Sequence, residues 1–427
     1  MKKLTALLCI TALLCGCTSK NSNTSDNTNN TSTDPSNVSD TVDDNTSTTG
    51  PTEPAPTDPV LDSDPSEMVV LGDTKDMTTV SNVDWAKIYR SELDDFKKSD
   101  DYDDTARFTV YDINDDRVPE LIISYGPYGN KTYLIKTLSD GYYTEFDPIT
   151  ECGMLNYVMD RSLITTTRYH DDIQVMNIQL YRLKGKALAN VGSFQRSSLA
   201  VKEDGNFVTE EQFTADYNHF ISGFIKDIGE DHSFDDDVIK AALGEYDDWK
   251  EAYAAVLGDY LKTRKENDNN HFSLMDINGD DIPELFISGA YHYAPYVNVF
   301  SWNGCPVPIG SLGNSDGTIG YDDKNGQIYS KVDNPSYTAI SIYNFNSENY
   351  KLTEAFSCGN TENSKKQDEN AEISYAVNGE RTDKSTYEKE VKANVNDSLY
   401  ILGMDNELTE ETIKNFKSGK YTASSKK

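Results

Sequence analysis

The stretch Asp112-Ile-Asn-Asp-Asp-Arg-Val-Pro-Glu-Leu121 recurs later in the chain as Asp276-Ile-Asn-Gly-Asp-Asp-Ile-Pro-Glu-Leu285, at an offset of 164 residues. Aligned at this offset without gaps, residues 84–124 and 248–288 share 17 identities in 41 positions. Self-similarity at a fixed spacing is typical of duplicated structural units. The sequence therefore predicts a tandem duplication, with one acidic loop in each copy.

Each copy begins with an amphipathic pattern that predicts a helix. Apolar residues recur at helical spacing, namely Trp85, Ile88, Tyr89, Leu93 and Phe96 in the first copy, and Trp249, Tyr253, Val256, Leu257, Tyr260 and Leu261 in the second. We expect these side chains to bury the helix on a sheet. Short β-prone runs at 107–111 and 271–275 lead into the acidic loops, and runs at 121–124 and 285–288 leave them as second strands.

Further strands and a closing helix are expected in each copy. Residues 173–181 and 337–343 alternate apolar and polar side chains, as one-faced antiparallel strands do. Asp-Gly and Asn-Gly pairs at 140–141, 303–304 and 325–326 are typical of hairpin turns. Helices are predicted at 209–225 and 384–393. The predicted fold is α+β, with an amphipathic helix and an antiparallel sheet in each of two units, 67–232 and 233–420, followed by a tail at 421–427.

The N-terminus has the features of a secreted protein. Residues 1–17 combine a basic start, an apolar run and a small residue before Cys17, which indicates a signal peptide. Their last four residues resemble a bacterial lipobox, in which Cys17 carries the lipid; an ordinary signal peptide is the alternative. Residues 18–66 are rich in Ser, Thr, Asn, Asp and Pro and predict a disordered tether. We therefore expect a lipid-anchored protein on the cell membrane, facing outside.

The charge and the cysteines narrow the possible partners. A net charge of −33 argues against nucleic acid as a partner and is compatible with cation binding. Three cysteines remain in the expected folded region: Cys152, Cys305 and Cys358. Cys305 and Cys358 belong to one predicted unit, but the odd count leaves their pairing open.

The acidic loops carry oxygen ligands at a regular spacing. Carboxylate or amide side chains stand at loop positions one, three, five and nine, which suits Ca²⁺ with its six to eight oxygen ligands. The alternative is an acidic turn that binds nothing, because Asp and Asn favour turns. Several carboxylates within nine residues, present twice, favour calcium. An EF-hand is not expected, because position six is Arg117 or Asp281 and strands flank the loops.

The pattern D-x-N-x-D-x-x-P-E-L between strands resembles the calcium hairpin of FG-GAP and VCBS-type repeats. The resemblance implies side-chain ligands and one backbone carbonyl in each loop: Asp112, Asn114, Asp116, Glu120 and the carbonyl of Val118, then Asp276, Asn278, Asp280, Glu284 and the carbonyl of Ile282. It covers about a dozen residues a copy, and two loops do not predict a closed propeller. The helix–loop–strand order is similar to that of secreted lipoproteins of Gram-positive gut bacteria, which have no assigned function.

The sequence offers no catalytic motif, so we do not expect an enzyme. The five histidines are scattered, and no nucleophile elbow or phosphate loop is present. A secreted glycan-active or other hydrolase with unidentified catalytic carboxylates remains the alternative. A transporter's substrate-binding subunit is less favoured, because it needs parallel βα units.

Aromatic residues after each loop are candidate contacts for a glycan or protein ligand. They are Tyr125, Tyr128 and Tyr133 in the first copy, and Tyr291, Tyr293 and Tyr296 in the second. The alternative is that these rings only cover the sheet. The sequence thus predicts a surface binding or structural module with two structural calcium sites.

Overall fold

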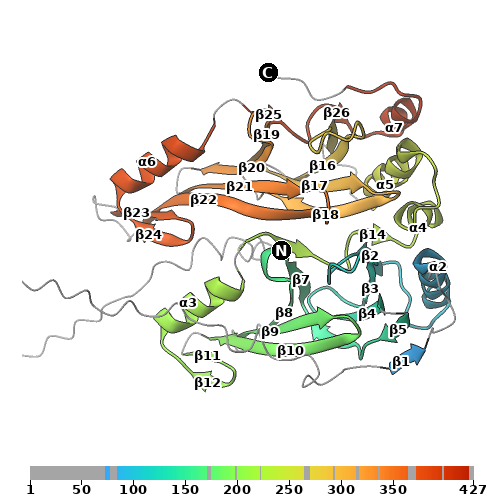
Figure 1. Ribbon diagram of the computed structural model, residues 1–427, viewed down its shortest axis with the longest axis horizontal. Coiled ribbons are helices and arrows are strands. Elements are labelled where there is room, and N and C mark those ends of the chain that lie inside the picture. Colours follow the sequence, from blue (N-terminus) through green and yellow to red (C-terminus); the bar gives the residue numbers. More distant parts are fainter. Residues whose placement is uncertain are drawn as a thin grey trace, which may run out of the picture.

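The chain folds into four antiparallel β-sheets, flanked in the described residues by six α-helices (Figure 1). The computed structural model describes residues 73–76, 84–139, 141–170, 175–197, 200–221, 223–263, 270–291, 294–313, 317–334, 337–363, 372–396 and 399–422. The predicted signal peptide, Cys17 and the 18–66 tether lie outside this part. The expected α+β fold, with one helix and one sheet in each unit, is wrong: the fold is mostly β.

Two sheets form the first half of the molecule. Sheet A has the order β1-β5-β4-β3-β2-β14, with β6 paired to β4, and sheet B has the order β12-β11-β10-β9-β8-β7-β13. The strands of sheet A are β1 (Asp73–Asp76), β2 (Arg107–Tyr111), β3 (Glu120–Tyr125), β4 (Lys131–Ser139), β5 (Tyr142–Glu145), β6 (Ile149–Cys152) and β14 (His232–Ser233). Those of sheet B are β7 (Met154–Val158), β8 (Leu163–His170), β9 (Val175–Lys184), β10 (Ala187–Arg196), β11 (Val201–Glu203), β12 (Asn206–Phe207) and β13 (Ile225–Asp227).

Two sheets of closely similar strand order form the second half. Sheet C has the order β18-β17-β16-β15-β26, and sheet D has the order β24-β23-β22-β21-β20-β19-β25. The strands of sheet C are β15 (His271–Met275), β16 (Glu284–Tyr291), β17 (Ala294–Trp302), β18 (Pro306–Leu312) and β26 (Asn406–Glu407). Those of sheet D are β19 (Gly317–Asp322), β20 (Gln327–Asn334), β21 (Tyr337–Asn346), β22 (Lys351–Asn363), β23 (Glu372–Val377), β24 (Glu380–Thr382) and β25 (Tyr400–Ile401).

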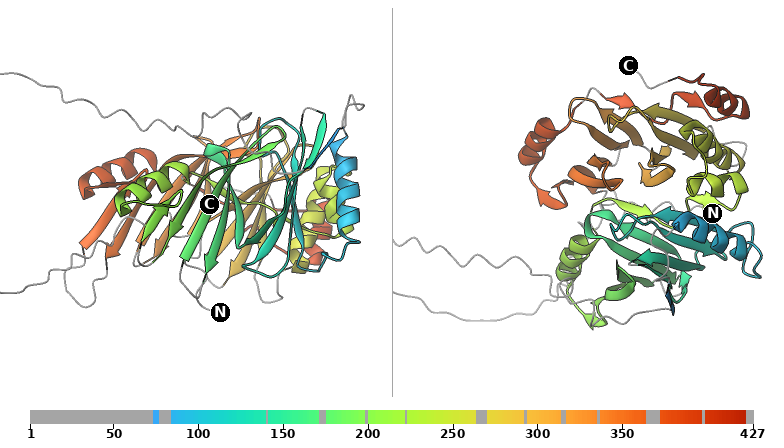
Figure 2. Two further views of the ribbon diagram at one scale, coloured as in Figure 1. Left: turned by 90° about the horizontal axis from the view of Figure 1, so that it is seen from below. Right: turned by 45° about the vertical axis from the view of Figure 1, so that its right-hand side comes forward.

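The helices lie at two opposite ends of the molecule (Figures 1 and 2). The helices α3 (Glu210–Phe220) and α6 (Lys384–Asn394) are at one end, beside sheets B and D. At the other end are α2 (Trp85–Phe96), α4 (Asp236–Ala242), α5 (Trp249–Thr263) and α7 (Glu410–Lys417). In the described part of the chain, no helix is long and apolar enough to cross a membrane.

Matching residues begin the helices α2 and α5. The side chain of Asp84 accepts a hydrogen bond from the backbone N of Lys87, and Asp248 accepts one from the backbone N of Lys250. Such caps satisfy amide groups that have no partner within the helix. The predicted aromatic stripes are buried on the sheets: Tyr89 packs on sheet A and Tyr253 on sheet C.

The strands beside the acidic loops are buried on both faces. In β3, Leu121 and Ile123 pack with α2, whereas Ile122 points into a core shared with sheet B. Two-sided burial explains why Leu121–Ile123 is a continuous apolar run instead of an alternating one. The second sheet of each half, absent from the prediction, covers the face that was expected to be open.

One hydrophobic core continues from the first half into the second. It includes Tyr111 and Tyr157 from the first half and Phe286 and Leu352 from the second, all at most 2% exposed. The edge strand β18 of sheet C lies against β13 and β2. The two halves therefore pack as one body with a shared interior.

Candidate functional site

The first acidic loop spans residues 112–119 between β2 and β3 and is closed by the pairing of Tyr111 with Glu120. The side chain of Asp112 accepts a hydrogen bond from the backbone N of Arg117 at 2.9 Å. The side chain of Asn114 accepts one from Asp116 N at 3.0 Å, and that of Asp116 one from Val118 N at 2.9 Å. The side chains at positions one, three and five therefore fix the conformation of the loop by accepting hydrogen bonds from its backbone.

The second loop, between β15 and β16, repeats this set of bonds. The side chain of Asp276 accepts from Asp281 N at 3.1 Å, that of Asn278 from Asp280 N at 3.0 Å, and that of Asp280 from Ile282 N at 2.8 Å. Each bond joins the same two loop positions as in the first copy. The shared residues thus produce the same local structure twice.

Backbone angles show the same repetition. Positions four and six have positive φ in both loops: 61° at Asp115 and 69° at Arg117, then 78° at Gly279 and 68° at Asp281. This conformation ordinarily costs a residue other than glycine about 1–2 kcal/mol. Arg117 is held in this conformation by the hydrogen bond that its backbone N donates to the side chain of Asp112.

The glutamate at position nine of the first loop is fully buried. Glu120 is 0% exposed and accepts hydrogen bonds from Ile113 N at 2.8 Å and the Thr137 hydroxyl at 2.9 Å. Burial raises the pKa of Glu120 well above its usual value, and the neighbouring Asp112 and Asp116 raise it further. A cation bound beside Glu120 would favour its ionised form and so lower this pKa.

Glu284 occupies the same place in the second loop. It is 0% exposed and accepts from Ile277 N and the Ser301 hydroxyl, each at 2.9 Å. Burial raises its pKa to about 7, against the hydrogen bonds from Ile277 and Ser301, which lower it. The two carboxylates are therefore matched in burial and in the kinds of group that bind them.

The first loop contains an acceptor that fits a cation. Asp112 Oδ1 is buried and has no hydrogen-bond partner among the described residues. The amide nitrogen of Asn114 lies between two carboxylates, 3.2 Å from Asp116 and 3.1 Å from Glu120. Within the described residues, no group of three or more His, Cys, Asp or Glu side chains is arranged to hold a metal ion.

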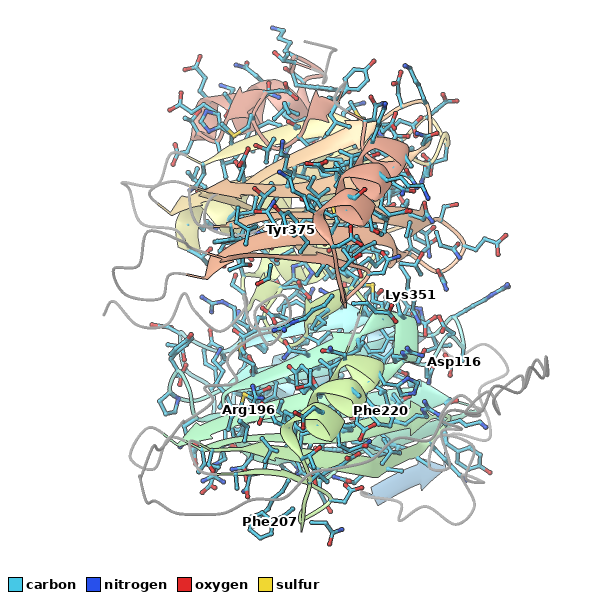
Figure 3. The ribbon with its side chains drawn as sticks, turned by 90° about the vertical axis from the view of Figure 1, so that its left-hand side faces the viewer. Asp116, Arg196, Phe207, Phe220, Lys351 and Tyr375 are labelled. Carbon is cyan, nitrogen blue, oxygen red and sulfur yellow. The ribbon has the colours of Figure 1, made fainter. Side chains whose placement is uncertain are left out.

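The first loop also contacts the second half of the molecule. Lys351, which begins β22 and is 4% exposed, places Nζ 2.7 Å from Asp115 and 2.7 Å from the Tyr157 hydroxyl. The Tyr157 hydroxyl in turn donates to the carbonyl of Ile113 at 2.8 Å. Figure 3 shows Lys351 at the junction of the halves, on the same side as Asp116 of this loop. The first loop is thus held by an ammonium group from the other half.

The candidate ligand-contact tyrosines lie in different surroundings. Tyr125 is half-buried with its ring 5.4 Å from that of Phe96, whereas Tyr128 is 76% exposed. Tyr133 is buried and Tyr296 is half-buried on β17. The side chains of Tyr291 and Tyr293 lie outside the described residues. The structure therefore shows one of these rings, Tyr128, extending into solvent.

The three cysteines in the described part of the chain are free thiols. Cys152 and Cys358 are buried, and Cys305 is half-buried. Burial raises the pKa of the Cys305 thiol to about 12, so it stays protonated at neutral pH. The pairing of Cys305 with Cys358, left open by the sequence, is not formed.

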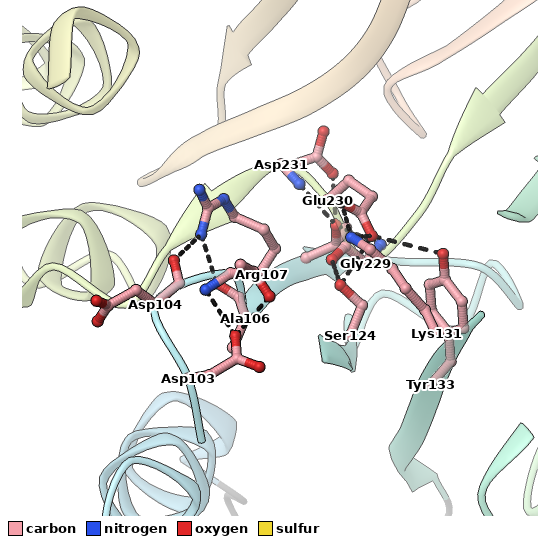
Figure 4. Close-up of polar contacts among 12 residues, drawn as sticks. Asp103, Asp104, Ala106, Arg107, Ser124, Lys131, Tyr133, Gly229, Glu230 and Asp231 are labelled. Atoms are coloured by element: carbon pink, nitrogen blue, oxygen red, sulfur yellow. Dashed lines mark hydrogen bonds and ion pairs between the residues drawn. The ribbon is translucent and has the colours of Figure 1, made fainter. Parts of the chain in front are cut away.

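A polar cleft between the two halves was not predicted from the sequence. Its cavity of about 230 Å³ is lined by Arg107, Lys226, Asp227, Glu230, Asp231, Asp259, Tyr260, Thr263, Asn298, Gly310 and Ser311. Figure 4 shows that Glu230 is bound by Lys131 and Ser124, and that Arg107 donates to the carbonyls of Asp104 and Ala106. These residues come from distant segments, and no local motif in the sequence connects them.

Comparison with known proteins leaves the family open. No family model matches the chain, and no curated protein matches it. Among solved structures, it is similar to the crystal structure of a protein from Lactobacillus plantarum, with 7% identity and a TM-score of 0.15 over 59% of this chain and 95% of that chain. A similarity at this level supports no inference about fold or function.

Proposed function

We propose that the chain is a lipid-anchored, outward-facing protein whose two acidic hairpins bind Ca²⁺ and stabilise a surface binding or structural module. The observation that carries the proposal is the pair of fully buried glutamates, Glu120 and Glu284, at the same position of two equivalent loops. Each is hydrogen-bonded by neutral donors, and each lies beside further carboxylates of its loop. A divalent cation would stabilise this concentration of buried negative charge.

The proposed ligands in the first site are the side-chain oxygens of Asp112, Asn114, Asp116 and Glu120, with the carbonyl of Val118. Asp112 Oδ1 supports this assignment, because it is a buried acceptor without a described donor. In the second site the ligands are Asp276, Asn278, Asp280, Glu284 and the carbonyl of Ile282. The role is structural, since the metal would join the two strands of each hairpin. Anchoring rests on Cys17 in the sequence alone.

The test is thermal unfolding of EDTA-treated protein titrated with CaCl₂. A free calcium concentration of about 100 times the dissociation constant should add about 2.7 kcal/mol to the free energy of unfolding for each site. The melting temperature should rise accordingly. Magnesium at equal concentration should have a smaller effect, because it dehydrates reluctantly and demands octahedral geometry.

Single substitutions assign the effect to the loops. Asp112→Ala and Asp276→Ala should each remove part of the calcium-dependent rise, and the double variant should remove nearly all of it. Asp95→Ala is the control, because Asp95 lies on α2 with its side chain 73% exposed. A melting temperature insensitive to calcium, or a rise that survives in the double variant, contradicts the proposal.

A further inference from the structure

The cleft between the halves has an unbalanced set of charges. Of its four carboxylates, Glu230 is paired with Lys131 at 2.6 Å and Asp231 with Lys226 at 2.8 Å. Among the lining residues, that leaves one further cation, Arg107, against the two carboxylates of Asp227 and Asp259. The remaining negative charge favours a cationic ligand over an anionic or neutral one.

Asp259 is an incompletely satisfied carboxylate in this cleft. It is 5% exposed, and its Oδ2 accepts a hydrogen bond from the backbone N of Ser233 at 3.0 Å. Its Oδ1 is buried and has no hydrogen-bond partner among the described residues. A buried carboxylate oxygen without a donor is costly, so this position fits an N–H group.

A second buried group without a partner lies beside Asp259. His232 is 1% exposed, and neither ring nitrogen has a hydrogen-bond partner in the described part of the chain. Its ring lies 5.3 Å from that of Phe108 in the first half and 6.0 Å from that of Phe300 in the second. The negative charges of Asp231 and Asp259 favour the protonated form of this histidine. Three unsatisfied polar atoms, Asp259 Oδ1 and the two ring nitrogens of His232, therefore lie where the two halves meet.

We propose that this cleft binds a small molecule through an ammonium group, with the Asp259 carboxylate as the buried counter-ion. The ammonium would pair with the Asp259 carboxylate and offset the negative charge of Asp227 and Asp259 that Arg107 does not balance. The cavity of about 230 Å³ holds only a small molecule, since each water in the liquid takes about 30 Å³. The ligand is a free amine or an amino acid, whose carboxylate would lie against Arg107. This inference is independent of calcium binding by the hairpins.

The experiment is isothermal titration calorimetry on the purified full chain, in CaCl₂ and separately in EDTA. The probes are ethanolamine for a free amine and glycine for an amino acid. Ethylene glycol and N-acetylglycine are their matched controls, because both lack the ammonium group. We expect saturable binding of at least one ammonium probe and none of its control. A response to ethanolamine alone identifies an amine site, and one to glycine alone an amino-acid site.

Substitutions locate the binding. Asp259→Asn keeps the shape of the side chain and an acceptor for the backbone N of Ser233, but it removes the negative charge. It should therefore weaken the affinity for the responsive probe about tenfold or more. Asp95→Asn is the matched control, because Asp95 is the residue 164 positions earlier in the duplicated segment and is exposed on α2. Asp227→Asn tests the same cleft from an exposed residue, should Asp259→Asn fail to fold.

The proposal is overturned if neither ammonium probe gives saturable heat, or if the matched controls bind equally well. It is also overturned if the folded Asp259→Asn protein, or in its place the Asp227→Asn protein, binds like the wild type. Binding that persists in EDTA, together with a calcium-insensitive melting temperature, would retain this inference while contradicting the calcium proposal.

Discussion

At the scale of the residue, the two halves differ most where they meet. His232 of β14 pairs with Phe108, and Asn406 of β26 pairs with Phe272 at the same register of the second half. His232 is buried against the other half, whereas Asn406 uses its amide to donate to the carbonyl of Thr422 at 2.9 Å. Equivalent positions therefore carry different chemistry, because only one of them faces the junction.

We expect His232 to make the stability of the protein depend on pH. Burial lowers the pKa of His232, although the charges of Asp231 and Asp259 act in the opposite direction. Below about pH 6.5 the unfolded chain therefore takes up a proton that the folded chain does not, and the free energy of unfolding falls as the pH decreases toward the lowered pKa. His232→Phe should remove this contribution, which is at most about 1.4 kcal/mol at pH 5.5.

The measurement is urea unfolding of both proteins at pH 7.5 and pH 5.5. The wild type should lose more free energy of unfolding between the two conditions than His232→Phe. Equal losses would show that His232 is protonated as readily in the folded chain as in the unfolded one.

At the scale of the element, local sequence predicted the hairpins well. The expected strands at 107–111 and 271–275 are β2 and β15 as observed, and the acidic loops join them to β3 and β16. The Asn-Gly pairs at 303–304 and 325–326 do connect adjacent antiparallel strands. These features depend on side-chain hydrogen bonds and backbone turn angles within about ten residues, so they can be predicted from the sequence.

The error in fold class arose from contacts between elements. The alternating pattern of β9 and β21 predicts sheets with one open face, with helices covering the other. In the structure, sheet A packs on sheet B and sheet C on sheet D, with residues such as Ile122 and Leu155 between them. Which sheet covers which face depends on the chain path and not on local periodicity.

Gly258 offers a test of the helix α5 alone. It lies within the helix, and a β-carbon there would meet no atom within 4 Å. Gly258→Ala should therefore raise the free energy of unfolding by about 0.5–1 kcal/mol, because alanine loses less conformational entropy in a helix. Urea unfolding at neutral pH measures the change, and a decrease would contradict the open space around this position.

At the scale of the whole molecule, contacts between the halves account for what the sequence did not reveal. The cleft combines Arg107, Asp231 and Asp259, which lie on β2, beside β14 and on α5. Lys351 reaches the first acidic loop from β22, with its Nζ 2.7 Å from Asp115. The acidic loops could be proposed from sequence because all their candidate ligands lie within one turn. The cleft could not, because its parts come together only when the halves pack.

Gly310 lies at a close contact between the two halves. It lies on β18 with φ of 141°, and a β-carbon there would come within 2.7 and 2.9 Å of ring carbons of Phe224 from the first half. Gly310→Ala should therefore lower the free energy of unfolding by about 1–3 kcal/mol, the usual cost of overpacking. Gly310 also lines the cleft, so the same substitution should weaken binding of the ammonium probe. The same change, glycine to alanine, is thus expected to stabilise the protein at Gly258 and destabilise it at Gly310. A Gly310→Ala protein that matches the wild type in both urea unfolding and probe binding would show that the halves do not pack this closely in solution.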